Sequence, residues 1–79
     1  MSSVPTPAEL TDILVAIIVG AAGGSDARWR EVTGPVEKLP VAKNVRSNWA
    51  VHPSGGAEEL DTIAKAVEIA RATYPYVAG

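Results

Sequence analysis

The sequence contains no cysteine, no phenylalanine and only one histidine, His52. Without cysteine, the chain cannot form a disulfide, and it lacks the commonest ligand of structural zinc. A metal site would have to be built from carboxylates around His52, and none lies close to it in the sequence. We therefore expect neither a metal nor a cofactor. The absence of cysteine also suits a reducing compartment and predicts a cytoplasmic protein.

Long apolar runs are missing as well. The longest runs from Ile13 to Ala22 and is well short of the roughly 20 residues that span a bilayer. The residues before it include Glu9 and Asp12 but no lysine or arginine, whereas a signal peptide begins with a basic region. We therefore expect no association with a membrane.

The composition is that of a small globular protein. Apolar residues make up 47% of the 79 residues and charged residues 20%, which predicts one folded domain over residues 1–79 with residues 1–5 frayed. A chain this short buries only about 60–65% of its unfolded surface, so its stability margin is small. Because disulfides are excluded, we expect self-association to supply additional stability.

The first helix is predicted near residues 7–22. Thr6-Pro7-Ala8-Glu9 is typical of a helix start, with Thr6 as the cap, Pro7 in the first turn and Glu9 closing a capping box. The β-branched residues of Ile13–Val19 would also suit a buried strand, and we favour the helix because the capping signals precede them. Such a helix is apolar on nearly every side, so we expect it to be central, buried all round and part of a homodimer.

Two further helices are predicted near residues 26–33 and 57–73. Ser25 can cap the second, and Gly34-Pro35 can end it. The third has an apolar stripe that should contact the first helix, formed by Leu60, Ile63, Val67, Ala70 and Tyr74.

The solvent side of the third helix and the segment before it complete the predicted fold. Asp61 and Lys65 are spaced to form an ion pair on that helix, as are Glu68 and Arg71. Leu39–Val41 and Trp49–Val51 could form two short strands between the second and third helices. The pattern predicts an α+β fold that is predominantly helical.

No catalytic motif is recognisable. His52 is the one candidate base, and its place between an apolar run and a proline favours a surface imidazole at a strand end. Glu58 and Glu59 are adjacent and so point in different directions on a helix. The glycine-rich segment 20–25 matches no phosphate-binding pattern and favours a simple link between two helices. We expect the protein not to be an enzyme; an enzyme subunit with a site at a dimer interface is the third alternative.

Charge is distributed unevenly along the chain. Residues 1–27 carry a net charge of −3, residues 28–52 carry +3 and residues 53–79 carry −2. The basic middle third also contains both tryptophans. Arginine and tryptophan are enriched at protein–protein contacts, and cations interleaved with aromatic rings also suit nucleic acid.

The most plausible function is that of a small non-catalytic binding or regulatory module. Its predicted contact surface is the basic, tryptophan-containing segment 28–52, for which a protein partner is favoured over nucleic acid. Nucleic-acid binding is the alternative, although the overall charge of −2 is unusual for it. At least one tryptophan is equally expected to fill the core. The predicted contact residues are Arg28, Trp29, Arg30, Lys43, Arg46 and Trp49.

Overall fold

A computed structural model describes residues 4–40, 42 and 47–78 of the chain. These residues form a predominantly helical α+β fold, as predicted, and the three helices have the predicted bounds. A two-stranded antiparallel sheet lies between the second and third helices. The elements are α1 (Pro7–Ala22), α2 (Asp26–Thr33), β1 (Glu37–Lys38), β2 (Trp49–Ala50) and α3 (Ala57–Thr73).

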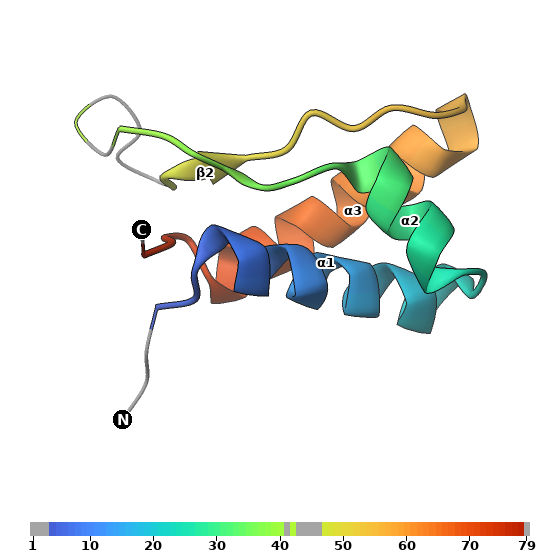
Figure 1. Ribbon diagram of the computed structural model, residues 1–79, viewed down its shortest axis with the longest axis horizontal. Coiled ribbons are helices and arrows are strands. Elements are labelled where there is room, and N and C mark those ends of the chain that lie inside the picture. The colour runs from blue at the N-terminus through green and yellow to red at the C-terminus, as the bar shows by residue number, and fades with distance from the viewer. Residues whose placement is uncertain (1–3, 41, 43–46, 79) are drawn as a thin grey trace.

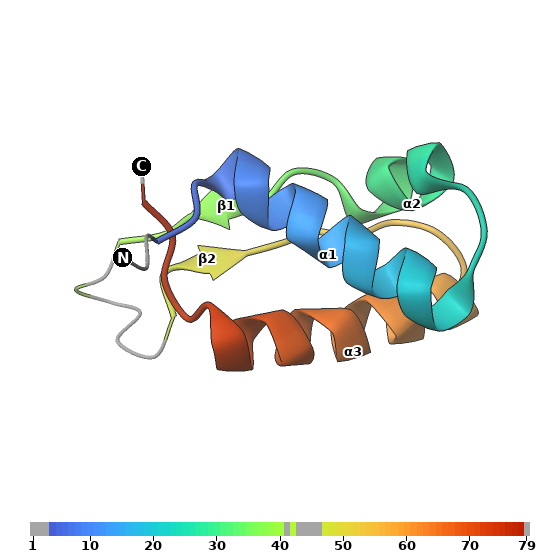
Figure 2. The same cartoon turned by 90° about the horizontal axis from the view of Figure 1, so that it is seen from below.

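The elements are arranged in two layers. Helix α1 lies in one layer and the strands with α2 form the other; α3 runs opposite to α1 and slants from the level of the strands to that of α1 (Figures 1 and 2). Helix α1 contacts both α2 and α3. None of the described helices is long and apolar enough to cross a membrane.

Helix α1 begins with the predicted capping box. The Thr6 hydroxyl accepts a hydrogen bond from the Glu9 amide at 3.1 Å, and the Glu9 carboxylate accepts one from the Thr6 amide at 3.0 Å. Together they satisfy two backbone donors that a helix start leaves free. The helical interpretation of Ile13–Val19 is therefore correct, and the strand alternative is not.

The prediction that α1 is buried on every side is wrong. One face is completely buried, but Ala16 and Gly20 on another side are exposed. The reason is the two-layer arrangement, in which the rest of the chain covers the helix from one direction only. The fully buried residues of this helix are Leu10, Leu14, Val15 and Ile18.

Helix α2 follows a glycine turn that is shaped around a tryptophan. Gly24 has a φ of +92°, which favours glycine, and a Cβ there would lie 3.0 Å from Nε1 of Trp29. The same Nε1 donates a hydrogen bond to the Gly23 carbonyl at 2.7 Å. Ser25 caps the helix as predicted, its hydroxyl accepting from the Arg28 amide at 3.4 Å. The glycine-rich segment is thus a structured link between α1 and α2.

Helix α3 contacts α1 through most of its predicted stripe. Ile63 is fully buried, whereas Leu60 in the first turn is 38% exposed and lies outside the core. The predicted ion pair between Asp61 and Lys65 forms, with 3.1 Å between the charged atoms. The pair predicted between Glu68 and Arg71 does not form, because the Arg71 guanidinium turns towards β2 instead.

The sheet is short and differs slightly from the prediction. Its register sets Glu37 opposite Ala50 and Lys38 opposite Trp49, so β1 begins two residues before the expected Leu39. The Leu39 amide continues the pairing by donating to the Asn48 carbonyl at 2.7 Å.

The ring of Trp49 lies in the core beneath this sheet. It is 1% exposed, and its Nε1 donates a hydrogen bond to the Tyr74 carbonyl at 2.8 Å. The Arg71 guanidinium lies 4.5 Å from the ring centroid and donates to the Trp49 carbonyl at 3.0 Å. A cation over an indole face is attractive, so Arg71 and Trp49 join α3 to β2.

The two ends of the described chain lie together at one end of the molecule. The buried side chain of Asn48 donates to the Val77 carbonyl and accepts from the Val77 amide, at 3.0 and 2.6 Å. The Ala78 amide donates to the carbonyl of Pro5 at 2.8 Å. Pro5 is buried, so the fraying expected for residues 1–5 does not extend to it; residues 1–3 lie outside the described part.

Candidate protein-binding site

The six predicted contact residues occupy three different settings. Arg28, Trp29 and Arg30 lie together on α2. Trp49 is a core residue in this fold, so its ring does not contribute to the surface. Lys43 and Arg46 fall outside the described residues.

Arg28 is held by acidic side chains from two elements. Its Nε and Nη2 donate to the two carboxylate oxygens of Glu59 at 3.3 and 3.2 Å, and Glu31 lies 3.9 Å away on α2. Glu59 also accepts from the Gly56 amide at 3.0 Å. The Gly56 hydrogen bond, followed by that of Arg28, lowers the pKa of Glu59 from its ordinary 4.5. The contact ties α2 to the first turn of α3.

Arg30 is paired in the same way on the other side of α2. Its Nη1 donates to the Asp12 carboxylate of α1 at 2.6 Å, and its Nε donates to Asp26 at 3.4 Å. The hydrogen bond that Arg30 donates to Asp12 is the main reason why the pKa of Arg30 is raised. The contact ties α2 to α1.

The surface around α2 is consequently acidic rather than basic. The two guanidiniums of Arg28 and Arg30 face four carboxylates, which gives this cluster a net charge of −2. Two of those carboxylates come from positions 18 and 31 residues away in the sequence. No local pattern indicates such contacts, so the sequence alone could not identify Asp12 and Glu59 as part of the site.

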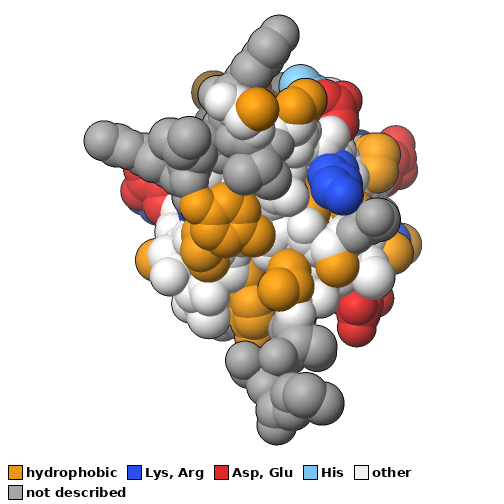
Figure 3. Space-filling view, turned by 90° about the vertical axis from the view of Figure 1, so that its left-hand side faces the viewer, with side chains coloured by type: hydrophobic (Ala, Val, Ile, Leu, Met, Phe, Trp, Pro, Cys, Tyr) orange, Lys and Arg blue, Asp and Glu red, His pale blue; other side chains and the backbone are white. Residues whose placement is uncertain are grey.

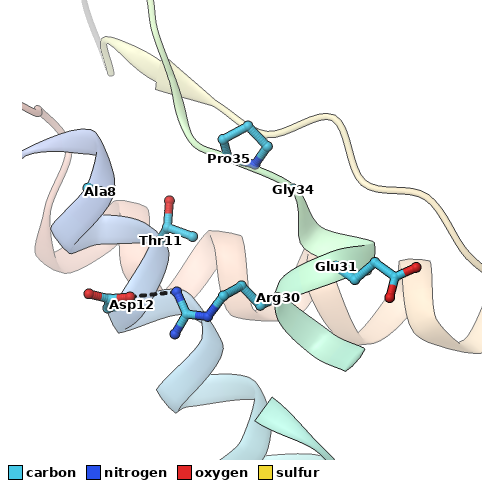
Figure 4. Close-up of a pocket in the computed structure, with 7 residues that line it drawn as sticks. All are labelled: Ala8, Thr11, Asp12, Arg30, Glu31, Gly34 and Pro35. Carbon is cyan, nitrogen blue, oxygen red and sulfur yellow. Dashed lines mark hydrogen bonds and ion pairs between the residues drawn. The ribbon is translucent and has the colours of Figure 1, made fainter. Parts of the chain in front are cut away.

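A groove opens beside Arg30, between α1 and the end of α2. Figure 4 shows Arg30 of α2 reaching across to Asp12 of α1 at one edge, with Ala8 one turn earlier on α1 and Pro35 on the segment that follows α2. Its volume is about 500 Å³ and its lining is mainly apolar. The lining residues are Ala8, Thr11, Asp12, Arg30, Glu31, Gly34 and Pro35.

One lining residue, Thr11, connects α1 to the segment that follows α2. The Thr11 hydroxyl donates to the Pro7 carbonyl at 2.9 Å and accepts from the Val36 amide at 3.2 Å. The second bond attaches the segment after α2 to α1. The groove is thus bounded by this hydrogen bond and by the Arg30–Asp12 ion pair.

The residues considered for catalysis are not brought together. The His52 side chain is 73% exposed, and its Nε2 lies 3.5 Å from the carboxylate of Glu37. Glu58 is exposed, and Glu59 is bound to Arg28. Across the described residues, no group of three or more histidine or acidic side chains could hold a metal ion.

A second concentration of apolar side chains lies at the end where the two termini meet (Figure 3). Val4 is 51% exposed and Tyr76 is 38% exposed.

Comparisons with known proteins give no family for the chain. No family model matches it, and neither a curated protein nor a solved structure does. A functional conclusion therefore rests on the side chains and surfaces of the molecule itself.

Proposed function

We propose that the protein is a small, non-catalytic, cytoplasmic binding module, and that the groove between α1 and α2 receives a segment of a partner protein. The observation that carries the proposal is the groove of about 500 Å³ beside Arg30, which has a mainly apolar lining and charged edges. Concave apolar surfaces with a few fixed polar groups are the usual form of a binding site.

The charges around the groove indicate which kind of partner segment would bind there. Asp12, Arg30 and Glu31 line its edge, and Asp26 adds a further carboxylate to the Arg30 cluster. The excess of carboxylates favours a cationic neighbour, and the lining favours an apolar side chain. The partner segment is therefore expected to carry an apolar anchor next to lysine or arginine.

Nucleic-acid binding is the weaker proposal. Phosphate contacts need cations that are free to replace counterions. Arg28 and Arg30 are both engaged with carboxylates, and Trp49, one of the two tryptophans, is buried. The described surface of α2 therefore offers little to a phosphate backbone.

Site-specific photocrosslinking in cells tests the proposal. A photoreactive amino acid would replace Ala8 at the groove or Ala64, which is exposed on α3 away from it. We expect a discrete adduct from position 8 and none from position 64. Mass spectrometry would identify the crosslinked segment, which would then be synthesised as a peptide.

Titration of this peptide against two matched variants completes the test. Ala8→Trp fills the groove, whereas Ala64→Trp places the same ring elsewhere on the surface. We expect Ala8→Trp to weaken peptide binding about tenfold or more and Ala64→Trp to leave it unchanged. Equal crosslinking at both positions, or equal affinity of both variants, would contradict the groove as the site. Oligonucleotide binding that weakens with salt would support the nucleic-acid alternative instead.

A further inference from the structure

The outer side of α1 and α3, away from the sheet, is not covered by any of the residues that the structure describes. We propose that a second copy of this protein docks on it, in a two-fold symmetric, antiparallel arrangement. This side is seen in Figure 2 and is called the α1–α3 face. Its residues are Ile13, Ala16, Ile17 and Gly20 on α1, and Lys65 and Ile69 on α3.

Apolar side chains on this face are left in contact with water. Ile69 is 57% exposed, and Ile13 and Ile17 are only half-buried. A cavity of about 200 Å³ lies between the two helices, with Ile17 on one wall and Ile69 on the other. Burying such surface is the main driving force for association, and a helix of a second copy could fill the hollow.

Gly20 is a second and independent indication. It lies within α1, where glycine destabilises a helix by about 1 kcal/mol relative to alanine. Nothing within the molecule requires it, because a Cβ at this position would meet no atom within 4 Å and its φ is not positive. A glycine is explained if another backbone approaches α1 closely at this point, as a helix of a partner would.

The charges on the face complement a second copy. Glu9 lies beside Ile13 at one end of the face, and Lys65 lies beside Ile17 at the other. A two-fold axis through the face brings each end against the opposite end of the other copy. Each Glu9 then faces a Lys65 of the other protomer, so that the dimer gains two complementary contacts.

The size of the face is consistent with a dimer. A stable interface buries about 800 Å² on each partner. That is about a sixth of the 4909 Å² accessible surface of the chain, which one side of a molecule with extents of 34, 27 and 18 Å can supply. The α1–α3 face is separate from the groove between α1 and α2, so either proposal can fail without the other.

Sedimentation equilibrium over the micromolar range tests the dimer directly. We expect the wild type to show twice its chain mass of 8.2 kDa at the upper concentrations. Ile69→Glu should raise the dissociation constant about tenfold or more, because it places a charge in the apolar contact. Leu60→Glu is the matched control, since it lies nine residues away and thus on the opposite side of α3. It should dissociate like the wild type.

Two further variants keep the test independent of misfolding. Gly20→Leu should also raise the dissociation constant about tenfold or more, while its circular dichroism stays that of the folded chain. Lys65→Glu should also weaken the dimer, because it places a carboxylate opposite Glu9 of the other copy. A wild type that stays monomeric, or a dimer unaffected by Ile69→Glu and Gly20→Leu, would overturn the proposal. A dimer unaffected by Lys65→Glu alone would overturn the two-fold arrangement.

Discussion

The two tryptophans belong to one basic segment of the sequence but to two different regions of the molecule. Trp49 is 1% exposed and lies under the Arg71 guanidinium, with its indole N–H bonded to the Tyr74 carbonyl. Trp29 is only partly buried and holds the turn before α2. An arginine beside a buried ring therefore stabilises the fold, whereas the arginines around Trp29 shape the surface. Clustering in sequence does not by itself create a common binding surface.

The largest expected effect is the difference in stability lost when Trp49 or Trp29 is replaced by alanine. Trp49→Ala should destabilise the protein by about 3–5 kcal/mol, because it leaves a large cavity in a small core. Trp29→Ala should cost about 1 kcal/mol, because its ring is partly exposed and its contacts are local. Urea denaturation followed by far-UV circular dichroism measures both. Similar losses from the two variants would contradict the division into core and surface.

The next effect concerns the polar group that ties the core region to the C-terminal segment. Asn48→Ala removes both hydrogen bonds between the Asn48 side chain and Val77. The backbone N–H and C=O of Val77 are then left without partners. The loss should be about 2 kcal/mol. Ser54→Ala, at an exposed position before α3, is the control and should leave the urea midpoint nearly unchanged.

Replacing Arg71 or Arg28 by methionine compares the stability that a partly buried arginine and an exposed arginine contribute. Arg71→Met retains bulk but loses the contacts with the ring and the carbonyl of Trp49, which should cost about 1–2 kcal/mol. Arg28→Met loses an exposed ion pair and should change stability by less than about 1 kcal/mol. Added salt should reduce the effect of Arg28→Met and leave that of Arg71→Met largely unchanged. A larger loss of stability from Arg28→Met than from Arg71→Met would show that the exposed ion pairs contribute more to the fold.

The smallest effect is a dependence on pH at the junction of α2 and α3. Because the pKa of Glu59 is lowered from 4.5 in the folded protein, the folded state binds this proton less readily than the unfolded state. The resulting stability is fully present above pH 4.5 and is lost as the pH falls through the folded pKa. Glu59→Gln should therefore flatten the melting temperature plotted against pH on the acid side. Arg28→Met should flatten it less, because the larger cause, the Gly56 amide, remains.

The helices were predictable because their signals are local. Thr6 and Glu9 cap α1 within one turn, and Ser25 does the same for α2. The contact set was not predictable, because Asp12 and Glu59 reach the arginines from distant parts of the sequence. Burial of α1 was overestimated for a related reason. Its composition reports how apolar the helix is, but only the packing of the other elements decides which of its sides they cover.

The hydrogen bond between the Ala78 amide and the Pro5 carbonyl makes the chain suitable for circular permutation. Since Pro5 and Ala78 meet, a short linker could join these two segments, and new ends could be opened at the exposed turn of Gly23 and Gly24 between α1 and α2. The same closeness would allow the whole unit to be inserted into a surface loop of another protein while leaving the ends of that loop side by side.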